Sequence, residues 1–421
     1  KELRAVSKWP TWNEEHFLDC ALITFAFAVA YDWLYDDWTP EARDMIAAAI
    51  IEKGLEKARP DDFWIHNGNN WAQVSHACMV AGSIAVADRC PELTQRLIAS
   101  AVTTFHEPLE FYGPNGGFPE GVGYWLFATT YTVLAIDAFK AAFGTDFGLS
   151  ADPGFAKSGE FQEIMMGPSG KLFGHSDSGS TRGPLPPIWW YAKTYNRPDL
   201  VAGIERELSL KFSDPGTQQG KVGDWDIPGC DHGCEYCYLP LIWMVDVPLV
   251  KGSSKIPLAW ESRGDVPVVI QSSDRRDGDF FWAGIKGGCS NFSHAHADQG
   301  SFVFDAYGER WSIDLGGENY GIGEKRHGMK FWNNATLDSP RWTYLRIGPQ
   351  GHSVVSIDAE NPNHLAYANI VDFKSDGKGN SSCRVDLTDV YPITRKSASR
   401  IATMQSAPRC WTWTRIRPFS S

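Results

Sequence analysis

The chain has no long apolar run and no excess of basic charge, and each absence argues against one class of protein. Within its 421 residues no apolar stretch approaches a membrane span, and residues 20–31, the best candidate, are followed at once by Asp32. We expect a buried helix there, because a span needs roughly 20 consecutive apolar residues. Lysine and arginine total 39 against 51 acidic residues, a net charge of −12, which argues against nucleic-acid binding. An anionic sugar is not excluded, since distant charges are screened beyond about 8 Å.

The nine cysteines follow no repeated pattern. Cys230, Cys234 and Cys237, with His232 between them, resemble a zinc knuckle. A second matching ligand pair is missing, so we do not expect a metal there. The 18 tryptophans and 14 tyrosines are either residues of large cores or flat rings that stack on sugar faces.

Length and periodicity predict two domains. Apolar residues at three-to-four spacing predict helices over residues 14–34, 40–59, 71–87, 91–105, 124–143 and 186–195. Later segments indicate strands over residues 268–271, 280–285, 301–304, 310–314, 353–357 and 366–373. We therefore expect a helical array or toroid over residues 1–255, followed by an antiparallel β-sandwich over residues 256–421.

The segment at residues 293–302, Ser-His-Ala-His-Ala-Asp-Gln-Gly-Ser-Phe, is the most informative part of the chain. His294 and His296 point to the same side if this segment is extended. Two strands joined by a turn at Tyr307-Gly308 are predicted to follow. One imidazole is then available for proton transfer and the other for a metal.

Three other segments are candidates for a binding site. Asn67, Asn69 and Asn70, followed by Gln73, lie at a predicted helix start. Any one Asn there is usually a cap, but three are more than a cap requires, and amide donors at a helix start suit a carboxylate ligand. Residues 116–125 form a glycine-rich loop that leads to Tyr124, which is either a core aromatic or a residue beside a ligand. Residues 173–179 form a polar loop that could line a cleft.

His296, Asp314 and His352 are oxygen and nitrogen ligands in the right number for zinc. Their spacing is long, so each is also compatible with a structural role.

These segments resemble the heparinase II/III family of polysaccharide lyases. The similarity is carried, in the family's order, by residues 69–71, 119–125, 294–302, 311–316, 341–346 and 351–353. It spans roughly residues 67–357, and the part around the two histidines is the most specific.

The resemblance implies an incomplete (α/α) toroid followed by an antiparallel β-sandwich, and β-elimination at a uronic acid in an acidic polysaccharide. It implies that Asn70, or Asn69, faces the substrate carboxylate, and that Tyr124 and His294 share the acid and base work. An amide that stabilises the developing charge is typically worth about 2.7–4 kcal/mol. We further expect Asn69, Gln73, Trp125, His175 and Arg341 to contact the substrate. The family's structural metal, which we expect to be zinc, maps to His296, Asp314 and His352.

The chain departs from alginate-cleaving relatives, which tend to have a His directly after the Asn pair where this chain has Trp71. This favours a glycosaminoglycan-type or an uncharacterised specificity over alginate, with His76 as an uncertain substitute for the missing histidine. The net negative charge argues against a heavily sulfated ligand. Arg341 and Arg346 are the best candidates for basic residues that would bind one. The resemblance further implies export to the periplasm or the exterior. Residues 410–415 differ in pattern from what precedes them, so we expect the β-sandwich to be truncated at its C-terminal end. The sequence leaves the oligomeric state open.

Two alternatives remain. A glycoside hydrolase on the same scaffold needs two carboxylates facing one cleft, and Glu120 and Asp177 are the candidate pair. A carbohydrate-binding relative without catalysis needs neither.

Overall fold

The computed structural model describes residues 1–181, 185–202, 238–250, 255–273, 280–356, 362–391, 401–407 and 410–414, the last two ranges by their backbone. The chain divides into two compact units, Lys1–Glu110 with Phe127–Phe155, and Phe111–Leu126 with Ala156–Ser421. Each unit is described by itself below.

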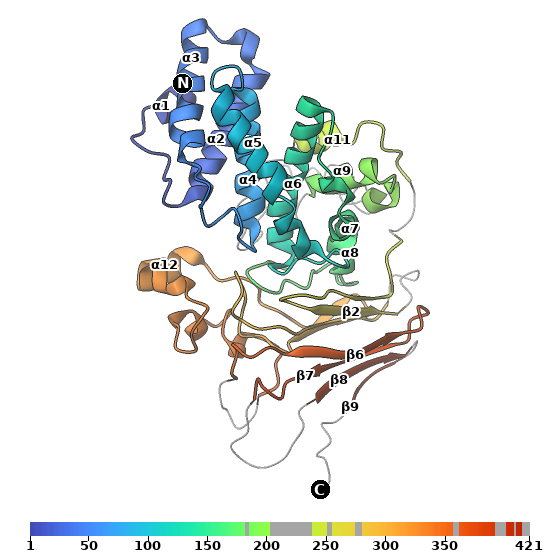
Figure 1. Ribbon diagram of the computed structural model, residues 1–421. Helices are drawn as coiled ribbons and strands as arrows, with labels where there is room; N and C mark the ends of the chain where they lie inside the picture. The colour runs from blue at the N-terminus through green and yellow to red at the C-terminus, as the bar shows by residue number, and fades with distance from the viewer. Residues whose placement is uncertain are drawn as a thin grey trace, which may run out of the picture. The chain divides into compact units, whose positions relative to one another are not determined.

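The first unit is helical (Figure 1). Its helices are α1 (Glu2–Val6), α2 (Phe17–Trp33), α3 (Pro40–Ala49), α4 (Asn70–Ala85), α5 (Pro91–Thr104) and most of α6 (Gly121–Phe143). The Thr39 side chain caps α3 by accepting from the Ala42 amide, and Pro40 occupies the first turn, where its missing N–H costs nothing.

Helices α2 and α4 pack closely because small residues lie at their contact. A Cβ on Gly82 of α4 would come within 2.7 Å of Thr24 Cγ2 of α2. Thr24 is fully buried, and its hydroxyl donates to the Cys20 carbonyl. The helix that starts at Pro40 changes to a π-helical turn over Ile50–Gly54, so the predicted helix to residue 59 is shorter than expected.

Helix α6 is, among the described residues, the one helix with the length and apolar composition to cross a membrane. The prediction from the sequence did not identify this helix as a possible span, because it considered residues 20–31 the best candidate. Of its most apolar stretch 61% is buried, as in the core helix of a soluble protein, so it is weak evidence for a span.

The second unit contains the short helices α8 (Phe161–Ile164), α9 (Pro186–Thr194) and α11 (Leu239–Trp243), with α7 (Pro153–Lys157) at its junction with the first. An antiparallel sheet follows in the order β1 (Ala259–Glu261), β2 (Val268–Ser272), β3 (Trp282–Lys286), β4 (Phe302–Ala306) and β5 (Glu309–Ser312). After α12 (Tyr320–His327), a second antiparallel sheet is formed by β6 (Asn369–Ser375), β7 (Ser381–Asp386), β8 (Ile401–Ala407) and β9 (Cys410–Thr414).

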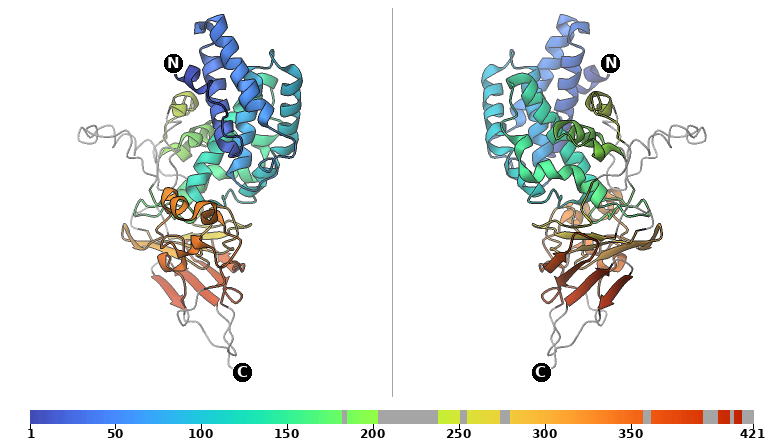
Figure 2. Two further views of the ribbon diagram at one scale, coloured as in Figure 1. Left: turned by 90° about the vertical axis from the view of Figure 1, so that its left-hand side faces the viewer. Right: turned by 90° about the vertical axis from the view of Figure 1, so that its right-hand side faces the viewer.

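The two sheets share one apolar core, and Figure 2 shows the second sheet next to the first. Val269 and Ile285 contribute to this core from the first sheet, and Cys383 and Val385 from the second. Strands β4 and β5 are joined at Tyr307 and Gly308, which have φ of 55° and 73°. Positive φ at both positions is typical of a two-residue hairpin, so the predicted turn is confirmed.

The helical region followed by antiparallel sheets was predicted correctly. The toroid, the sandwich and the boundary near residue 255 stay predictions. Residues 353–356 are not a strand: Ser353 instead bonds the Ser312 hydroxyl at 2.7 Å, and the Val355 carbonyl accepts from Tyr391. Strands β1 and β7 and helix α12 were not predicted, and the cysteine group at 230–237 lies outside the described residues.

Candidate functional site

The loop between β3 and β4 carries the two histidines in a turn and not in an extended segment. His294 has φ of +60°, a conformation uncommon for a residue other than glycine. The reason given for expecting both imidazoles on one side is therefore wrong. They nevertheless converge, because His294 and His296 both contact one carboxylate, that of Asp177.

Asp177 belongs to the polar loop at residues 173–179 and is completely buried. Its Oδ1 lies 2.9 Å from His296 Nε2. Its Oδ2 lies 3.0 Å from His294 Nδ1 and 2.9 Å from Arg341 Nη2. Burial alone would raise the pKa of Asp177, but the Arg341 guanidinium and the two imidazoles hold it well below its usual range. The group is therefore a charged carboxylate that accepts from three side chains.

Tyr124, in the first turn of α6, stacks on His294 with ring centroids 3.8 Å apart and planes inclined by 16°. Its hydroxyl lies 2.8 Å from that of Tyr320, which in turn lies 3.3 Å from His294 Nδ1. Burial, with the charge of Asp177 next, raises the pKa of Tyr320 well above its usual value, so this phenol stays protonated. Two hydroxyls and one imidazole thus form a connected polar group around His294.

The glycine-rich loop before Tyr124 approaches the loop that carries Asp177. Gly121 has φ of +84°, and a Cβ there would lie 2.6 Å from both the His175 carbonyl and Ser178 Oγ. Ser178 Oγ also accepts from the Gly123 amide at 3.1 Å. These glycines therefore allow a close approach between two loops of the protein, whereas a close approach to a ligand was considered in the sequence analysis.

His296, Asp314 and His352 lie together, with one ligand atom from each within 4.8 Å of the other two. His296 Nδ1 and His352 Nε2 are buried without a hydrogen-bond partner among the described residues. Burial acts to raise the pKa of Asp314, but the charge of His352 and its hydrogen bond bring it to about 2. An ionised carboxylate and two buried imidazole nitrogens are a donor set that fits zinc.

Three residues predicted at the substrate are buried in the second unit. Trp125 donates to Ser158 Oγ at 2.5 Å, and His175 Nδ1 lies 3.0 Å from Ser176 Oγ. Arg341, only 1% exposed, holds Asp177 and donates to the Ala295 carbonyl at 3.2 Å. Their binding role stays a prediction, while their visible contacts are structural.

Asn69, Asn70 and Gln73 belong to the first unit. Asn69 caps α4, its Oδ1 accepting from the Trp71 amide at 3.0 Å. Asn70 and Gln73 are each 1% exposed in the first turn of the same helix. Their roles stay predictions, since Tyr124 and His294 belong to the other unit.

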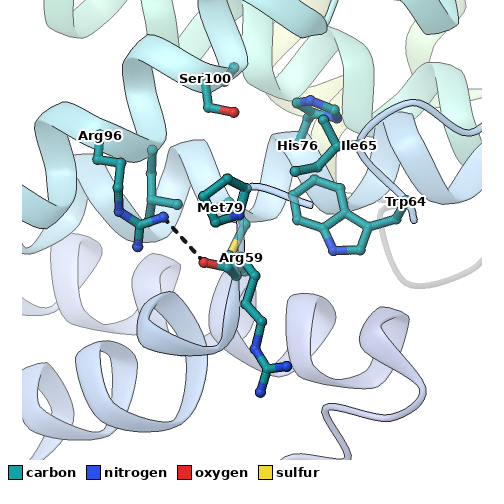
Figure 3. A pocket seen from close by; sticks show the side chains of 11 residues that line it. Arg59, Trp64, Ile65, His76, Met79, Arg96 and Ser100 are labelled. Carbon is teal, nitrogen blue, oxygen red and sulfur yellow. Dashed lines mark hydrogen bonds between the residues drawn. The ribbon is translucent and has the colours of Figure 1, made fainter. Parts of the chain in front are cut away.

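His76, the suggested substitute for the histidine after the Asn pair, lines a cavity of about 80 Å³ in the first unit (Figure 3). Its Nδ1 lies 2.6 Å from the Ala72 carbonyl and its Nε2 2.7 Å from Thr104 Oγ1. Burial lowers the pKa of His76 to about 4. With both nitrogens bonded to neutral groups, this imidazole is not available for proton transfer.

The comparisons with known proteins bear on the second unit most directly. Residues 280–396 match the model of the heparinase II/III-like C-terminal family. This part of the chain is similar to that family. The matched segment contains His294, His296, Asp314, Tyr320 and His352, whereas Tyr124 and Asp177 lie before it.

Solved heparinase III structures share the fold. A heparinase III with methylated lysines has a TM-score of 0.57 and 12% sequence identity. The alignment covers 94% of this chain and 51% of the heparinase III chain. A second heparinase III has a TM-score of 0.57 and 10% identity, covering 92% and 53%. The chain thus spans about half the length of these structures, and no curated protein matches it by sequence.

Two functional candidates escaped prediction. Tyr320 lies in a helix that was not expected, six residues after Asp314, and its contact with Tyr124 depends on the fold. Asp177 was considered only as a hydrolase carboxylate. The signal for it was its position between two serines, two residues after His175, in a loop with a glycine at each end.

Proposed function

We propose that this chain is a polysaccharide lyase that cleaves a uronic-acid-containing acidic polysaccharide by β-elimination. The observation that carries the proposal is the stacked pair of Tyr124 and His294, whose ring centroids are 3.8 Å apart, with His294 held by buried Asp177. A phenol and an imidazole in contact supply the acid and the base that elimination requires. The heparinase II/III-like domain and the heparinase III fold support the same reaction class.

The reaction removes the C5 proton of the uronate and breaks the bond between C4 and O4. His294 is suited to take the proton, because an imidazole is a base near neutral pH. Tyr124 is suited to protonate O4 as it leaves, and the product has a C4–C5 double bond. We assign these two residues jointly, since the division of acid and base depends on which uronate epimer is bound.

Removal of the C5 proton places charge on the uronate carboxylate, and an amide donor there lowers the barrier. We propose Asn70 for this role, with Asn69, Gln73, Trp125, His175 and Arg341 assisting substrate binding. The (α/α) toroid, the β-sandwich and export to the periplasm or exterior belong to the same proposal. The support for the fold is the likeness to heparinase III over more than nine-tenths of the chain.

We propose zinc at His296, Asp314 and His352. The ion would cross-link the loop after β3 to segments after β5 and before β6 and so fix the backbone that carries His294. This is a structural role, and the residues named above carry the reaction.

The hydrolase alternative finds less support. Asp177 would have to serve as the base or nucleophile opposite Glu120, but it is completely buried and both of its carboxylate oxygens accept hydrogen bonds from protein side chains.

The experiment is incubation of the protein with a panel of uronate polymers, from unsulfated glycosaminoglycans and heparan sulfate to alginate, read by ultraviolet absorption of the unsaturated sugar end. Tyr124→Phe and His294→Ala should each lower the rate at least about 100-fold. Tyr307→Phe is the matched control, because Tyr307 is 69% exposed in the hairpin turn. New reducing ends without absorption would indicate a hydrolase, and no product across the panel would contradict catalysis on this substrate class.

A further inference from the structure

We propose that Asp177 is a positioning residue that fixes the tautomers of His294 and His296 at the same time, and so couples the reacting imidazole to the metal site. The inference rests on the proposed function for the roles of the two histidines. Its geometric basis is independent of that function.

The carboxylate lies between the two rings and contacts a different nitrogen of each. Oδ1 is 2.9 Å from Nε2 of His296, and Oδ2 is 3.0 Å from Nδ1 of His294. The Asp177 amide also donates to the His294 carbonyl at 3.1 Å. The loop that carries Asp177 is therefore bound to the histidine loop through both backbone and side chain.

An ionised carboxylate only accepts hydrogen bonds, and a neutral imidazole has a single N–H. Each ring must therefore place its hydrogen on the nitrogen that faces Asp177. His294 then has its lone pair on Nε2, where a proton can be taken up. His296 has its lone pair on Nδ1, the nitrogen that is buried without a hydrogen-bond partner among the described residues. One carboxylate thus presents a base on one ring and a metal ligand on the other.

Further contacts keep Asp177 in place. Arg341 donates to Oδ2 at 2.9 Å and to the Ala295 carbonyl, between the two histidines, at 3.2 Å. A Cβ on Gly317 would lie 3.2 Å from the backbone of Asp177, so the segment after Asp314 packs on the same loop. The carboxylate is therefore held from the side of the histidine loop and from the side of the metal ligand Asp314.

An asparagine at position 177 has nearly the same shape but offers one oxygen and one NH₂ group. Whichever ring faces the NH₂ must present a lone pair to it and carry its hydrogen on the other nitrogen. The result is either a His294 without a base at Nε2 or a His296 without a ligand at Nδ1. Asp177→Asn should therefore impair proton transfer, zinc binding or both.

The test compares Asp177→Asn with Asp305→Asn. Asp305 is also a fully buried carboxylate paired with an arginine, Arg310, in the second unit, but no imidazole is among its hydrogen-bond or ion-pair partners in the described residues. The measurements are kcat and KM on the cleaved polymer, zinc retained against chelators of increasing strength, and imidazole ¹⁵N shifts, assigned with His294→Gln and His296→Gln.

We expect Asp177→Asn to lower kcat at least about 100-fold with little change in KM, or to weaken zinc binding about 10–100-fold. Asp305→Asn should change neither, although it lowers the thermal midpoint. In the unaltered protein, the ¹⁵N shifts should report N–H at Nδ1 of His294 and at Nε2 of His296.

The opposite tautomer on either ring of the unaltered protein would overturn the proposal, and this result does not depend on whether Asp177→Asn folds. A folded Asp177→Asn with kcat, zinc affinity and ¹⁵N shifts all within about twofold of the parent would also overturn it. If no polymer is cleaved, the proposed function fails, whereas the shifts and the zinc affinity still decide the role of Asp177.

Discussion

Buried imidazoles occur in both units of this protein, and they differ in what faces their nitrogens. His76, in the first unit, contacts a backbone carbonyl and a threonine hydroxyl, and burial takes its pKa to about 4. His294 and His296, in the second, face a charged carboxylate with one nitrogen each. Burial alone therefore does not indicate a reactive histidine. The distinguishing feature is a carboxylate that fixes the ring while its other nitrogen remains for a proton or a metal.

The largest expected effect is a loss of zinc binding when a histidine of the second unit is replaced, but not when His76 of the first unit is replaced. His296→Ala removes one of the three proposed zinc ligands and should reduce zinc affinity at least about 100-fold, because an outer partner alone is typically worth 10–100-fold. His76→Ala should leave the zinc content unchanged. Metal analysis after dialysis against a chelator measures both variants, and equal zinc retention in the two would contradict the assigned site.

The next effect concerns a buried ion pair near the proposed metal site. Lys286 and Asp298 form an ion pair in which both side chains are completely buried. Lys286→Met should lower the free energy of unfolding by about 3–5 kcal/mol, because it leaves a buried carboxylate without its counter-charge. Urea denaturation measures this loss. The double variant Lys286→Met/Asp298→Leu should recover part of the stability, and no recovery would show that packing and not charge is responsible.

A pH titration tests the histidine of the first unit. The pKa of His76 falls from 6.5 to about 4 on folding, so below pH 6.5 the unfolded chain binds a proton that the folded protein does not. Stability is therefore lost as the pH falls from 6.5 toward 4, by roughly 3 kcal/mol for this group. Urea unfolding of His76→Gln at several pH values should lack that part of the decrease. An identical pH dependence in the two proteins would contradict the assignment.

The smallest effect is expected at the rim of the cavity in Figure 3. Arg96 is exposed there and donates to the Ala58 carbonyl at 3.3 Å. Arg96→Ala should change the free energy of unfolding by less than about 1 kcal/mol, since such a bond competes with water. A loss comparable to that of Lys286→Met would show that the cavity depends on charge after all.

Local patterns explain what could be predicted from the sequence. Helices α2, α4, α5 and α6 and strands β2 to β5 each have a periodic apolar pattern, and the hairpin turn has its glycine. Helix α12 was missed because its eight residues include two glycines and its start depends on the Asn319 side chain accepting from the Ile322 amide.

The candidate site was only partly predictable for a different reason. His294 and His296 are two positions apart in the sequence, whereas Asp177 lies 117 residues before His294 and Arg341 lies 164 residues after Asp177. Contacts at such separations depend on the fold, and no local pattern specifies them. His296, Asp314 and His352 were expected to form a group, and the structure brings these three side chains together, whereas their binding of a metal stays a prediction.

The assignment of residues 111–126 to the second unit has a practical consequence for anyone who divides this gene. A shortened version made by cutting at residue 255 would retain His294 but omit Tyr124 and Asp177, which the imidazole contacts. Such a fragment would be an unsuitable reagent for crystallography or inhibitor screening, even if it were expressed well. The minimal piece that preserves the histidine's surroundings must include two stretches of chain separated by a helical insertion.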